Sequence, residues 1–472
     1  MSSHRTTLDG SHHSGPEGSE TPEPAWALVV VWCTEASRLG EALVVDPKRR
    51  SAVAFGREHL DDGTMIALRR QRPGQDTPSV PFENPYLSRR HLELVADGDG
   101  VRVANVGKRP VLVNGRVTNG ELARVGDVVE IKNLVAFLVV RRPSPFPTIS
   151  VPFERVPFGE ADGQGIVGES ARTWELRDRI AFCAGRNAHV LVNGESGCGK
   201  ELVAQAMHAL SSRAQKRMVS RNAATLPHGI ADAELFGNVA NYPNPGMPER
   251  AGIIGEAHES TLFLDEIGEL SHDLQAHLLR VLDEGGEYQR LGDARRRRAD
   301  IRVVAATNRP IEELKHDLLS RLVLRLEVPG LNDRREDIPL VARHLLRKMV
   351  AHDSALASRF GAAPTMTTDL CRALLKHAYT THVRELHGLL LRAMASSRSP
   401  QIELTPEVEA LVATPAVTRP REARELGADE IRAALARHAG VREKVWRELD
   451  LPSRHALHRL MKKYGIAGAD DE

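Results

Sequence analysis

The stretch HVLVNGESGCGKELVAQAMHAL, residues 189–210, decides how the middle of this chain folds. It begins with β-prone apolar residues, continues with glycines and ends with apolar residues at helical spacing. That order predicts a strand, a loop and a helix. The loop fits the pattern GxxxxGK at Gly194, Gly199 and Lys200. Backbone amides in such a loop point at phosphate oxygens, and the following helix N-terminus favours negative charge. The stretch therefore predicts a site for nucleotide phosphates.

The predicted ligand is a nucleotide, and the whole loop with the start of its helix supplies candidate contacts. These are Gly194, Glu195, Ser196, Gly197, Cys198, Gly199, Lys200 and Glu201. Lys200 is expected to neutralise the β- and γ-phosphates. Glu201 stands where the general motif has Ser or Thr, so magnesium needs another protein ligand.

That ligand is predicted in STLFLDEIGEL, residues 260–270, an apolar strand that ends in two acids. Asp265 is expected to hold Mg²⁺, directly or through water, and Glu266 to activate the attacking water. A third strand, residues 303–308, ends in Thr307 and Asn308, which are candidates for sensing the γ-phosphate. The chemistry predicted from these segments is the hydrolysis of a nucleotide's phosphate chain.

Composition limits the remaining possibilities. The chain has 472 residues, 41% hydrophobic and 27% charged, with a formal net charge of +1. This length allows about three domains. No apolar run reaches the roughly 18 residues of a membrane span, so the sequence predicts a soluble protein without a membrane partner. The four dispersed cysteines argue against zinc and disulfides and for the cytoplasm. Any contact with nucleic acid must come from a local patch.

The order of predicted elements makes the chain multidomain. An antiparallel β-sandwich is followed by an α/β ATPase core with a helical lid and by a small all-α domain. The predicted boundaries are a disordered tail at 1–24, the sandwich at 25–142, a proline-rich linker at 143–164, the core at 165–335, the lid at 336–412, a second linker at 413–425 and the small helical domain at 426–472.

The middle of the chain resembles a known family over about residues 165–395. The blocks that carry the resemblance are GESGCGKELVAQAMHALS, RNAATLP, ELFG, TLFLDEIGEL, LLRVLDEGGEYQRLG, IRVVAATNRP and DRREDIPLVARHLL, in this order. They are similar to the AAA+ domain of bacterial enhancer-binding proteins, which activate RNA polymerase carrying sigma-54. In that family a Glu follows the loop lysine, as Glu201 does here. The resemblance implies a ring, usually a hexamer, with ATP bound between subunits.

The resemblance also implies roles for four further residues. Asn222 matches the residue that switches the catalytic glutamate, and Arg384 matches the sensor arginine of the lid. Arg321 matches one arginine finger that acts on the neighbouring subunit, while Lys315 stands at the other finger position. Lysine keeps the charge there but lacks the planar fork of arginine. Before Arg384 the family has Trp-Pro-Gly-Asn, and this chain has residues 379–382, YTTH.

One loop departs further from the family. After ELFG the family carries a GAFTGA loop whose Phe and Thr contact the sigma factor. The aligned residues 241–246 read NYPNPG. Tyr242 could still supply an aromatic tip, while Pro243 and Pro245 restrict φ and predict a stiffer, more turn-like loop. Two interpretations stay open: a regulator that remodels the sigma-54 polymerase with an altered tip, or one that contacts a different partner or none.

The predicted sandwich carries three short blocks that resemble a forkhead-associated (FHA) domain, which binds phosphothreonine peptides. The blocks are Gly56-Arg57, Ser88-Arg89-Arg90-His91 and Asn114-Gly115. Arg57 and Ser88 match phosphate contacts, with Arg89 beside them, and charge-assisted bonds from such groups can hold a phosphate.

Two further residues of these blocks have other expected roles. His91 matches a residue that supports the loop, and we expect a structural role for it. Where the family often has a first Asn-Gly that grips the peptide backbone, this chain has Arg109-Pro110, so the selection of the peptide is open.

The C-terminal segment from residue 426 predicts three short helices with a shared apolar core and resembles the Fis-type helix-turn-helix of many enhancer-binding proteins. The resemblance implies binding to DNA at an enhancer-like upstream site. The candidate DNA contacts are Ser453, Arg454, His455, His458, Arg459 and Lys462. Basic residues at this spacing suit phosphates that flank a major groove.

Two functional classes therefore compete. The first is an ATP-hydrolysing transcription regulator in which an FHA domain senses phosphothreonine and the ring acts on a sigma factor. The second is an adaptor that binds phosphoprotein, nucleotide and DNA but does not hydrolyse ATP. Glu266 and Arg321 favour the first class, and Lys315 and NYPNPG favour the second.

Overall fold

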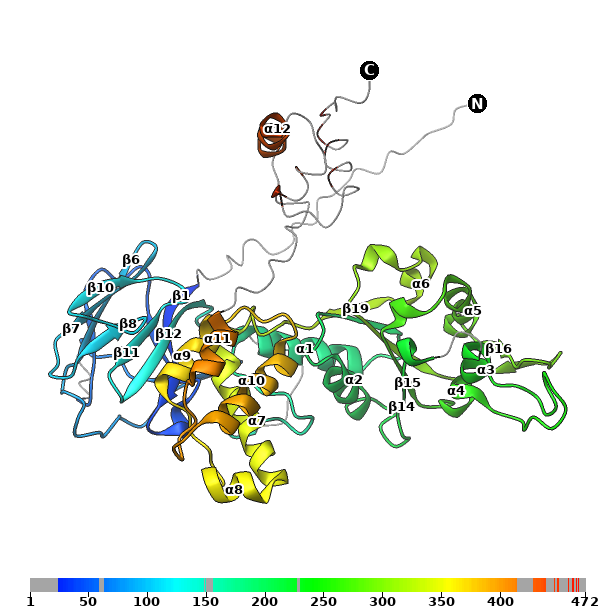
Figure 1. Ribbon diagram of the computed structural model, residues 1–472, viewed down its shortest axis with the longest axis horizontal. Coiled ribbons are helices and arrows are strands. Elements are labelled where there is room, and N and C mark those ends of the chain that lie inside the picture. Colours follow the sequence, from blue (N-terminus) through cyan, green and yellow to red (C-terminus); the bar gives the residue numbers. More distant parts are fainter. Residues whose placement is uncertain are drawn as a thin grey trace, which may run out of the picture. The chain divides into compact units, whose positions relative to one another are not determined.

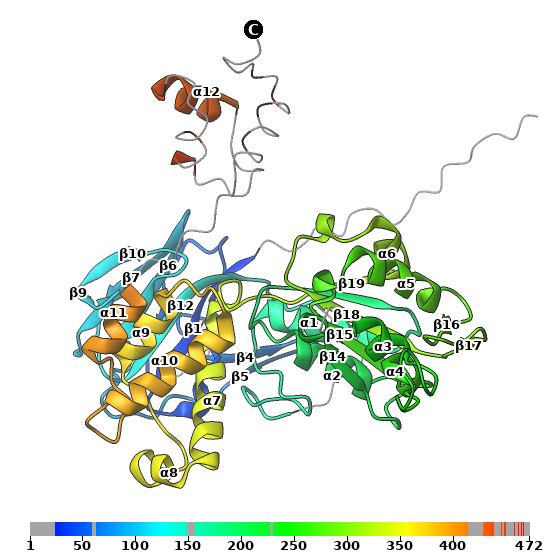
Figure 2. The ribbon, with the colours of Figure 1, turned by 45° about the vertical axis from the view of Figure 1, so that its right-hand side comes forward.

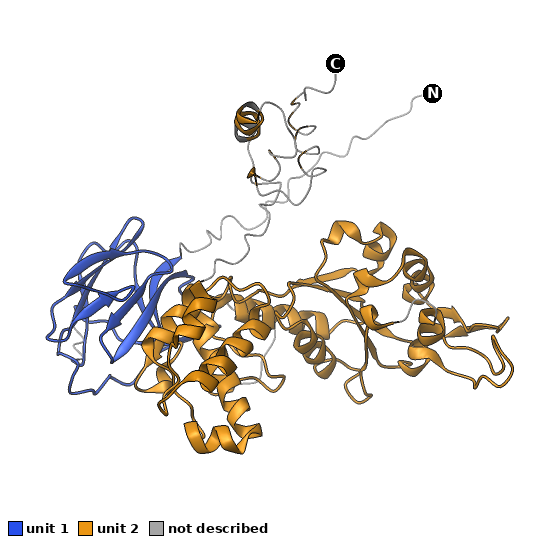
Figure 3. Ribbon diagram, in the orientation of Figure 1, with its two compact units in different colours: residues 1–30, 41–149 blue, residues 31–40, 150–472 orange. Residues whose placement is uncertain are grey.

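The computed structural model describes residues 24–58, 63–147, 149, 156–226, 230–413 and 428–438, with residues 445, 448, 449, 457, 461, 464 and 466. The chain divides into two compact units (Figure 3). The first comprises residues 1–30 and 41–149, and the second comprises residues 31–40 and 150–472. None of the helices in these described residues has both the length and the apolar character needed to cross a bilayer.

The first unit consists of short β-strands, shown in blue to cyan in Figure 1. The strands are β1 (Ala25–Cys33), β2 (Ala42–Val45), β3 (Val53–Phe55), β4 (Arg69–Arg72), β5 (Gln75–Pro78), β6 (Leu92–Asp97), β7 (Gly100–Asn105), β8 (Val111–Val113), β9 (Arg116–Thr118), β10 (Gly120–Ala123), β11 (Val128–Ile131) and β12 (Val135–Arg142). A 3₁₀ turn, η1 (Ala36–Arg38), follows β1.

These strands form two antiparallel sheets. Among the described residues their orders are β5-β4-β2-β1-β12-β11-β8-β9 and β10-β7-β6-β3. Phe55 of one sheet packs edge-on against Phe137 of the other, with ring centroids 5.6 Å apart. Along β6 the buried residues alternate with half-buried ones, as expected for a strand that covers a core with one face. The architecture agrees with the predicted sandwich.

Four of these strands were not predicted. The sequences of β4 and β5, RRQR and QDTP, are mostly polar, and the four residues of β5 are exposed. An edge strand that lies on no core shows no apolar alternation, so its sequence resembles a loop. The short strands β9 and β10 are also largely exposed.

The second unit contains a parallel sheet with helices on both faces (Figure 2). Its strands are β13 (Val190–Asn193), β14 (Val219–Asn222), β15 (Thr261–Asp265), β18 (Arg302–Thr307) and β19 (Leu324–Glu327), in the order β14-β15-β18-β13-β19. All their pairings are parallel. Apolar runs at residues 189–194, 217–222, 261–266, 301–308 and 323–328 predict these five strands.

The two faces of this sheet bury different side chains. Val190 and Val192 point to one face, where they pack with α1 (Ala171–Ala184) and α2 (Lys200–Ala209). Leu191 points to the other face, which is covered by α3 (Ala231–Phe236), α4 (Gly252–Glu256), α5 (His272–Leu282) and α6 (His316–Arg321). A strand buried on both faces reads as a continuous apolar run, which is why its sequence identified it.

Shorter elements connect these layers. They are the 3₁₀ turns η2 (Ala223–Thr225), η3 (Ile267–Glu269), η4 (Ile311–Glu313) and η5 (Arg335–Asp337), and a hairpin of β16 (Glu287–Gln289) and β17 (Arg296–Arg298). The hairpin was not predicted, because its strands carry charged residues.

A group of helices follows the core, coloured yellow to orange in Figure 1. They are α7 (Ile338–His352), α8 (Ser354–Phe360), α9 (Thr368–Lys376), α10 (His382–Ser396) and α11 (Pro406–Ala413), and the last ends one residue beyond the range 336–412 predicted for a lid. Asp337, at the start of α7, is buried and accepts hydrogen bonds from the backbone and hydroxyl of Ser170 and from the Thr173 hydroxyl. These bonds fix the lid to the start of α1.

The predicted linker at 143–164 needs correction. Phe146 is buried against Arg142, so the sandwich continues past its last strand. Asp162 is buried and pairs with Arg177 of α1 at 3.1 Å, so the ATPase unit begins before residue 165. Prolines in this segment suggested a linker, but the long-range contacts that order it leave no local signal. The second predicted linker lies almost entirely outside the described residues.

At the C-terminal end the structure describes α12 (Ala428–Arg437) and a small apolar cluster. The sequence predicts a core of seven apolar residues here, and five of them, Ile431, Val445, Leu449, Leu457 and Met461, are buried in this cluster. Leu435 is half-buried, and Leu460 lies outside the described residues.

Candidate functional site

The glycine-rich loop lies between β13 and α2, with backbone angles that glycine tolerates. Gly197 has φ of 77° and Gly199, the residue before α2, has φ of 107°. A Cβ on Gly194 would lie 2.8 Å from the sulfur of Cys198. Cys198 is buried, and burial raises its thiol pKa, so it packs the loop and has little thiolate character.

Lys200 begins α2 and is almost completely buried. Its Nζ donates to the carbonyl oxygens of Gly194 at 2.9 Å and Glu195 at 3.2 Å. The same Nζ lies 3.8 Å from Oε1 of Glu266. The loop lysine and the acid that follows β15 therefore face one another.

Asp265 and Glu266 lie at the carboxyl end of β15, beside the end of the parallel strand β14. Asn222 ends β14 next to Asp265 of β15, and its Nδ2 donates to Oδ2 of Asp265 at 3.3 Å. Glu266 has φ of 52°, a left-handed conformation that costs energy for a residue with a side chain. Its Oε2 accepts a hydrogen bond from the backbone amide of Asn308 at 3.3 Å. In this state Asn222 contacts Asp265 and not Glu266.

The chemistry of these donors fits magnesium. Mg²⁺ prefers oxygen ligands and usually combines one or two carboxylates with phosphate oxygens and water. Asp265 supplies such a carboxylate beside the glycine-rich loop. Within the described residues, no group of three or more His, Cys, Asp or Glu could hold a metal. A magnesium ion here would thus share Asp265 with the phosphates of a nucleotide.

The loop, the two acids and the lid line an open cavity of about 750 Å³. Its walls include Ile166 and Val167 before α1, and Leu345 of α7. Arg384 and Lys348 bring positive charge from the lid. An apolar wall suits a base, and cations near the loop suit phosphates, so the cavity has the composition of a nucleotide site.

The turn before α10 docks directly onto the glycine-rich loop. The Val383 amide donates to the Gly197 carbonyl at 3.1 Å, and Arg384 Nη1 donates to Ser196 Oγ at 3.1 Å. A Cβ on Gly197 would lie 2.2 Å from the carbonyl oxygen of Thr381. The segment YTTH thus still brings the predicted sensor arginine to the loop.

His382 adds a contact that the sequence did not predict. Its Nδ1 accepts the Leu331 amide at 3.2 Å, and its Nε2 contacts the carboxylate of Glu195. Burial lowers the pKa of His382, which keeps the ring neutral. With Nδ1 as acceptor, Nε2 carries the proton and donates it to Glu195. The departure from the family motif at this position was the one signal that could have drawn attention to it.

The predicted finger residues lie on the α6 side of the core. Arg321 Nε donates to Oδ1 of Asp283 at 2.6 Å. The Lys315 amine makes no hydrogen bond or ion pair with any residue that the structure describes.

The remaining candidates of the nucleotide site lie on β18 and α2. Thr307 is buried and its hydroxyl accepts the backbone amide of Arg309 at 3.0 Å, while Asn308 is exposed. Glu201 is exposed on the first turn of α2, with Gln205 Nε2 3.3 Å from its carboxylate.

The loop that replaces GAFTGA is folded on itself. Asn238 is buried, and its Nδ2 donates to the carbonyls of Val239 and Pro248, at 3.0 Å each. Asn241 Oδ1 accepts the Gly246 amide at 2.8 Å. The ring of Tyr242 packs against Gly292. A Cβ added to Gly292 would lie 2.6 Å from this ring. The loop therefore rests on the segment between β16 and β17.

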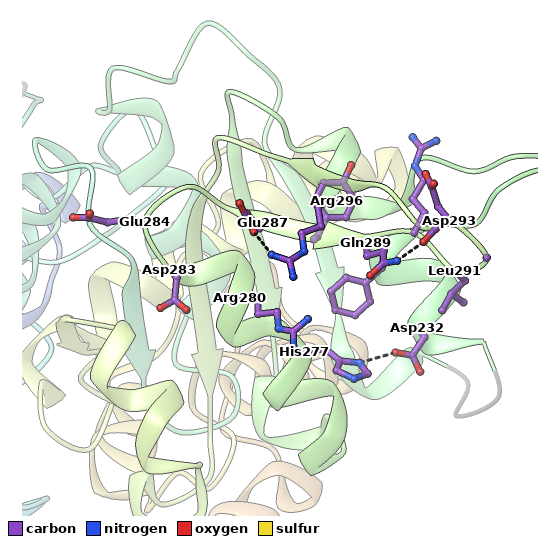
Figure 4. A pocket seen from close by; sticks show the side chains of 14 residues that line it. Asp232, His277, Arg280, Asp283, Glu284, Glu287, Gln289, Leu291, Asp293 and Arg296 are labelled. Atoms are coloured by element: carbon purple, nitrogen blue, oxygen red, sulfur yellow. Dashed lines mark hydrogen bonds and ion pairs between the residues drawn. The ribbon is translucent and has the colours of Figure 1, made fainter.

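A second cavity, of about 580 Å³, lies under this hairpin and is distinct from the nucleotide cavity (Figure 4). Residues of α3, α5 and the hairpin line it. In Figure 4, His277 points toward Asp232 and Arg296 toward Glu287. Acidic and basic side chains alternate around its wall, so it favours no single class of ligand.

The predicted phosphate contacts of the sandwich lie on adjacent loops. The Arg57 amide donates to the Ser88 carbonyl at 3.1 Å, and the Lys108 amide donates to Ser88 Oγ at 3.0 Å. His91 is buried; its Nδ1 accepts the Ser88 amide at 3.1 Å. Arg57 and Arg89 are exposed. His91 thus supports the loop in the structural role expected for it.

Two further sets of predicted residues lie in the sandwich and in the C-terminal segment. Asn114 and Gly115, both with positive φ, form the tight turn between β8 and β9. The six candidate DNA contacts lie outside the described residues. They are Ser453, Arg454, His455, His458, Arg459 and Lys462.

Residues 166–331 match the sigma-54 interaction domain family, and residues 332–421 match the AAA+ ATPase lid domain family. The chain therefore carries the AAA+ ATPase module of sigma-54-type transcription regulators, with its helical lid.

Several curated relatives bear the name anaerobic nitric oxide reductase transcription regulator NorR. The protein from Klebsiella pneumoniae (strain 342) is 35% identical over 349 residues, which cover 68% of this chain and 65% of the relative. That from Escherichia coli O139:H28 is 36% identical over 342 residues, covering 67% and 66%. This chain thus spans slightly less than two thirds of the length of these relatives. A solved structure of NtrX from Brucella abortus in complex with ATP is 29% identical, with a TM-score of 0.46, and the match covers 64% of this chain and 69% of that one.

Proposed function

We propose that this chain is a transcription regulator whose AAA+ module binds and hydrolyses ATP to act on RNA polymerase carrying sigma-54. The observation that carries the ATPase proposal is the position of Lys200 Nζ, buried and 3.8 Å from Glu266, beside the carboxylate of Asp265. A lysine held between a glycine-rich loop and two acids is the arrangement that phosphoryl transfer needs.

Each residue has a proposed role in that reaction. On nucleotide binding, Lys200 exchanges its contacts with the Gly194 and Glu195 carbonyls for phosphate oxygens. Asp265 would hold Mg²⁺, and this ion would supply charge neutralisation for the phosphates. Glu266 accepts a proton from the attacking water. Asn222 and Asn308, which contact the two acids, orient them.

ATP turnover by the full-length protein tests this proposal. Lys200→Ala is expected to abolish ATP binding and turnover together, because the main phosphate cation is lost. Glu266→Gln is expected to keep binding while lowering turnover by about a hundredfold or more, since the base is removed. Equal turnover in wild type and Glu266→Gln would refute the assigned base.

We infer that the active form is a ring, usually a hexamer, in which Arg321 of one subunit reaches the nucleotide of its neighbour, with Lys315 beside it. In this state Arg321 is bound to Asp283 of its own subunit, so ring assembly has to exchange that partner. Arg384, already on the glycine-rich loop, is placed to follow the nucleotide state from the lid.

The contact with sigma-54 is proposed through the loop at residues 241–246, where Tyr242 is the aromatic group and is 40% exposed. Co-purification of sigma-54 with the protein held in an ATP transition-state analogue tests it. Retention that is lost in Tyr242→Ala supports the contact. If no sigma factor is retained although the analogue is bound, the ring acts on another partner.

A second candidate function is an adaptor that binds nucleotide without hydrolysing it. It is favoured by Lys315 at a finger position and by the NYPNPG loop, which is folded on itself and pinned to the neighbouring hairpin. Protein that binds ATP with Lys200 intact but shows no turnover when concentrated and bound to DNA would establish this alternative.

We further propose that the two flanking parts of the chain select signal and promoter. The sandwich is proposed to be an FHA domain that binds phosphothreonine through Arg57, Ser88 and Arg89, which lie on neighbouring loops. The C-terminal helices are proposed to be a Fis-type DNA-binding domain. Removal of residues 426–472 should abolish binding to promoter DNA while ATP binding persists.

A further inference from the structure

We propose that the phosphothreonine site of the sandwich selects ligands with acidic residues next to the phosphothreonine, and that Lys108, Arg109 and Lys132 make this selection. This inference rests on the proposed phosphothreonine binding and adds the identity of the peptide. These three residues, which we call the basic rim, lie on two loops beside Ser88.

Hydrogen bonds connect the rim to the phosphate contacts without interruption. Ser88 accepts the Lys108 amide at 3.0 Å through its hydroxyl oxygen. The Arg109 carbonyl is the partner of His91 Nε2 at 3.2 Å, and His91 also holds the Ser88 amide. Arg109 Nη1 donates to the Lys132 carbonyl at 2.8 Å. A ligand whose phosphate lies at Ser88 thus has the rim directly beside it.

The Arg109 side chain is held in place and does not swing freely in solvent. Its guanidinium lies over the ring of Tyr86, 4.8 Å from the centroid, while Nη1 is bound to Lys132. Within the described residues, Arg109 Nε and Nη2 have no hydrogen-bond partner. A fixed guanidinium with free N–H groups is suited to bind a carboxylate, because little rotamer entropy remains to be lost.

Charge at this end of the sandwich strongly favours an acidic ligand. In the described parts of the four loops, residues 56–58, 79–91, 106–110 and 132–134, the cations are Arg57, Arg89, Arg90, Lys108, Arg109 and Lys132, and the acids are Glu58 and Glu83. Of these cations, Arg90 has a carboxylate partner, Glu93, at 3.4 Å. The side chains of Lys108 and Lys132 are exposed and bind nothing in the described residues.

Arg109-Pro110 stands where an Asn-Gly was expected to grip the peptide backbone. Pro110 has no amide hydrogen, and the Arg109 carbonyl is already bound to His91. The usual amide contact is therefore replaced by a fixed cation. We therefore expect the sandwich to select its peptide by the charge of the peptide's side chains and not by contacts with the peptide backbone.

The chain itself contains a sequence of the predicted kind and supplies the probe. Thr21 is flanked by Glu17, Glu20 and Glu23. Fluorescent peptides of residues 15–24 would be compared in four forms, with Thr21 phosphorylated or not, and with the three glutamates kept or changed to glutamine. Binding to the full-length protein is measured by fluorescence anisotropy.

The phosphorylated acidic peptide is expected to bind about three- to tenfold more tightly than the phosphorylated glutamine peptide, the range of a few exposed ion pairs. The difference should shrink in high salt. Lys108→Glu and Lys132→Glu should each reduce or abolish this difference in affinity between the two phosphorylated peptides. Arg116→Glu is the matched control, since Arg116 follows the turn at the opposite end of the sandwich and is equally exposed.

The outcomes separate the two hypotheses. Equal binding of the phosphorylated acidic and glutamine peptides would overturn the proposed selection and leave phosphothreonine binding intact. Equal binding of phosphorylated and unphosphorylated acidic peptides would overturn both. A comparable loss of the difference in Arg116→Glu would show a general charge effect and would also overturn the role of the rim. Unchanged thermal midpoints of the variants check that each remains folded.

Discussion

At the scale of single residues, His382 connects the start of the lid helix α10 to the glycine-rich loop. Its backbone has φ of 42°, and its ring fills the space beside Gly330, where a Cβ would lie 2.4 Å from the ring. From there it donates to the Glu195 carboxylate in the glycine-rich loop. This donor partly neutralises a negative charge that lies next to the expected phosphates.

We predict that His382→Ala weakens ATP binding about three- to tenfold, because Glu195 then repels the phosphates without a hydrogen-bond donor. Turnover at saturating ATP should change less. Equilibrium binding of a fluorescent ATP analogue measures the effect.

Glu195→Gln in the same background is the control. It removes the charge and should restore most of the lost affinity if the repulsion is the cause. Additive losses in the double variant would contradict this explanation.

At the scale of elements, the loop at residues 238–250 owes its conformation to one buried side chain. Asn238 is 2% exposed, and its Nδ2 lies within hydrogen-bonding distance of three carbonyls of the loop, those of Val239, Tyr242 and Pro248. Ion pairs of Glu249 with Arg290 and of Arg250 with Glu234 hold the end of the loop to neighbouring elements. These contacts hold the loop against its neighbouring elements.

We predict that Asn238→Ala loosens this loop without affecting the nucleotide site. The substitution removes the donor to the carbonyls of Val239, Tyr242 and Pro248, a local loss of about 1 kcal/mol. Hydrogen exchange of peptides covering 238–250 should accelerate, while ATP binding stays the same. Asn244→Ala, at an exposed position of the same loop, is the control. Unchanged exchange in Asn238→Ala would show that the ion pairs alone hold the loop.

At the scale of the whole molecule, the proposed ring makes each catalytic site depend on two subunits. Lys200→Ala removes the nucleotide from its own site but leaves Arg321 able to serve a neighbour. Arg321→Ala does the reverse. Each variant alone is expected to be inactive or nearly so, since an arginine finger contributes on the order of a thousandfold to turnover.

We predict that mixing the two variants restores ATP turnover. With random assembly, roughly a quarter of the subunit interfaces pair an intact nucleotide site with an intact finger. The measurement is turnover of a one-to-one mixture against each variant alone at the same total concentration. A mixture as inactive as its components would show that Arg321 does not act across subunits.

The pH dependence of stability is also a property of the whole molecule. Burial lowers the pKa of several histidines on different elements, namely His91, His189, His208, His344 and His382. Between each lowered pKa and the ordinary value of 6.5, the unfolded chain binds more protons than the folded one. The stabilisation is present above pH 6.5 and is lost as the pH falls below it.

We therefore predict that the thermal midpoint decreases between pH 7.5 and pH 5.5. Glu385 does not counteract this change. Burial opposes ionisation of its carboxyl, but hydrogen bonds from Thr381, His377 and Thr380 outweigh burial and keep the pKa lowered, so its contribution is lost only below about pH 4.5. Differential scanning calorimetry at three pH values tests the prediction. His91→Asn should reduce the pH dependence of the sandwich, and a midpoint that rises toward pH 5.5 would contradict the prediction.

The sequence alone predicted the parallel sheet, the glycine-rich loop and the acids Asp265 and Glu266, because each has a local signal. Strands buried on both faces give continuous apolar runs, and a phosphate loop needs glycines at fixed spacing. The sequence also indicated a sandwich and a lid. It missed the polar edge strands β4 and β5, which have no apolar alternation, and it took the ordered segment around Asp162 for a linker.

Only the tertiary structure decided which side chains meet across long sequence separations. His382 and Glu195 lie 187 residues apart, and no local pattern links them. The same holds for Arg321 and Asp283, and for the chain of contacts from Ser88 through Lys108 and Arg109 to Lys132. Local periodicity determines an element and the face it buries. Contacts between distant loops depend on how the elements pack, and packing follows from the whole chain at once.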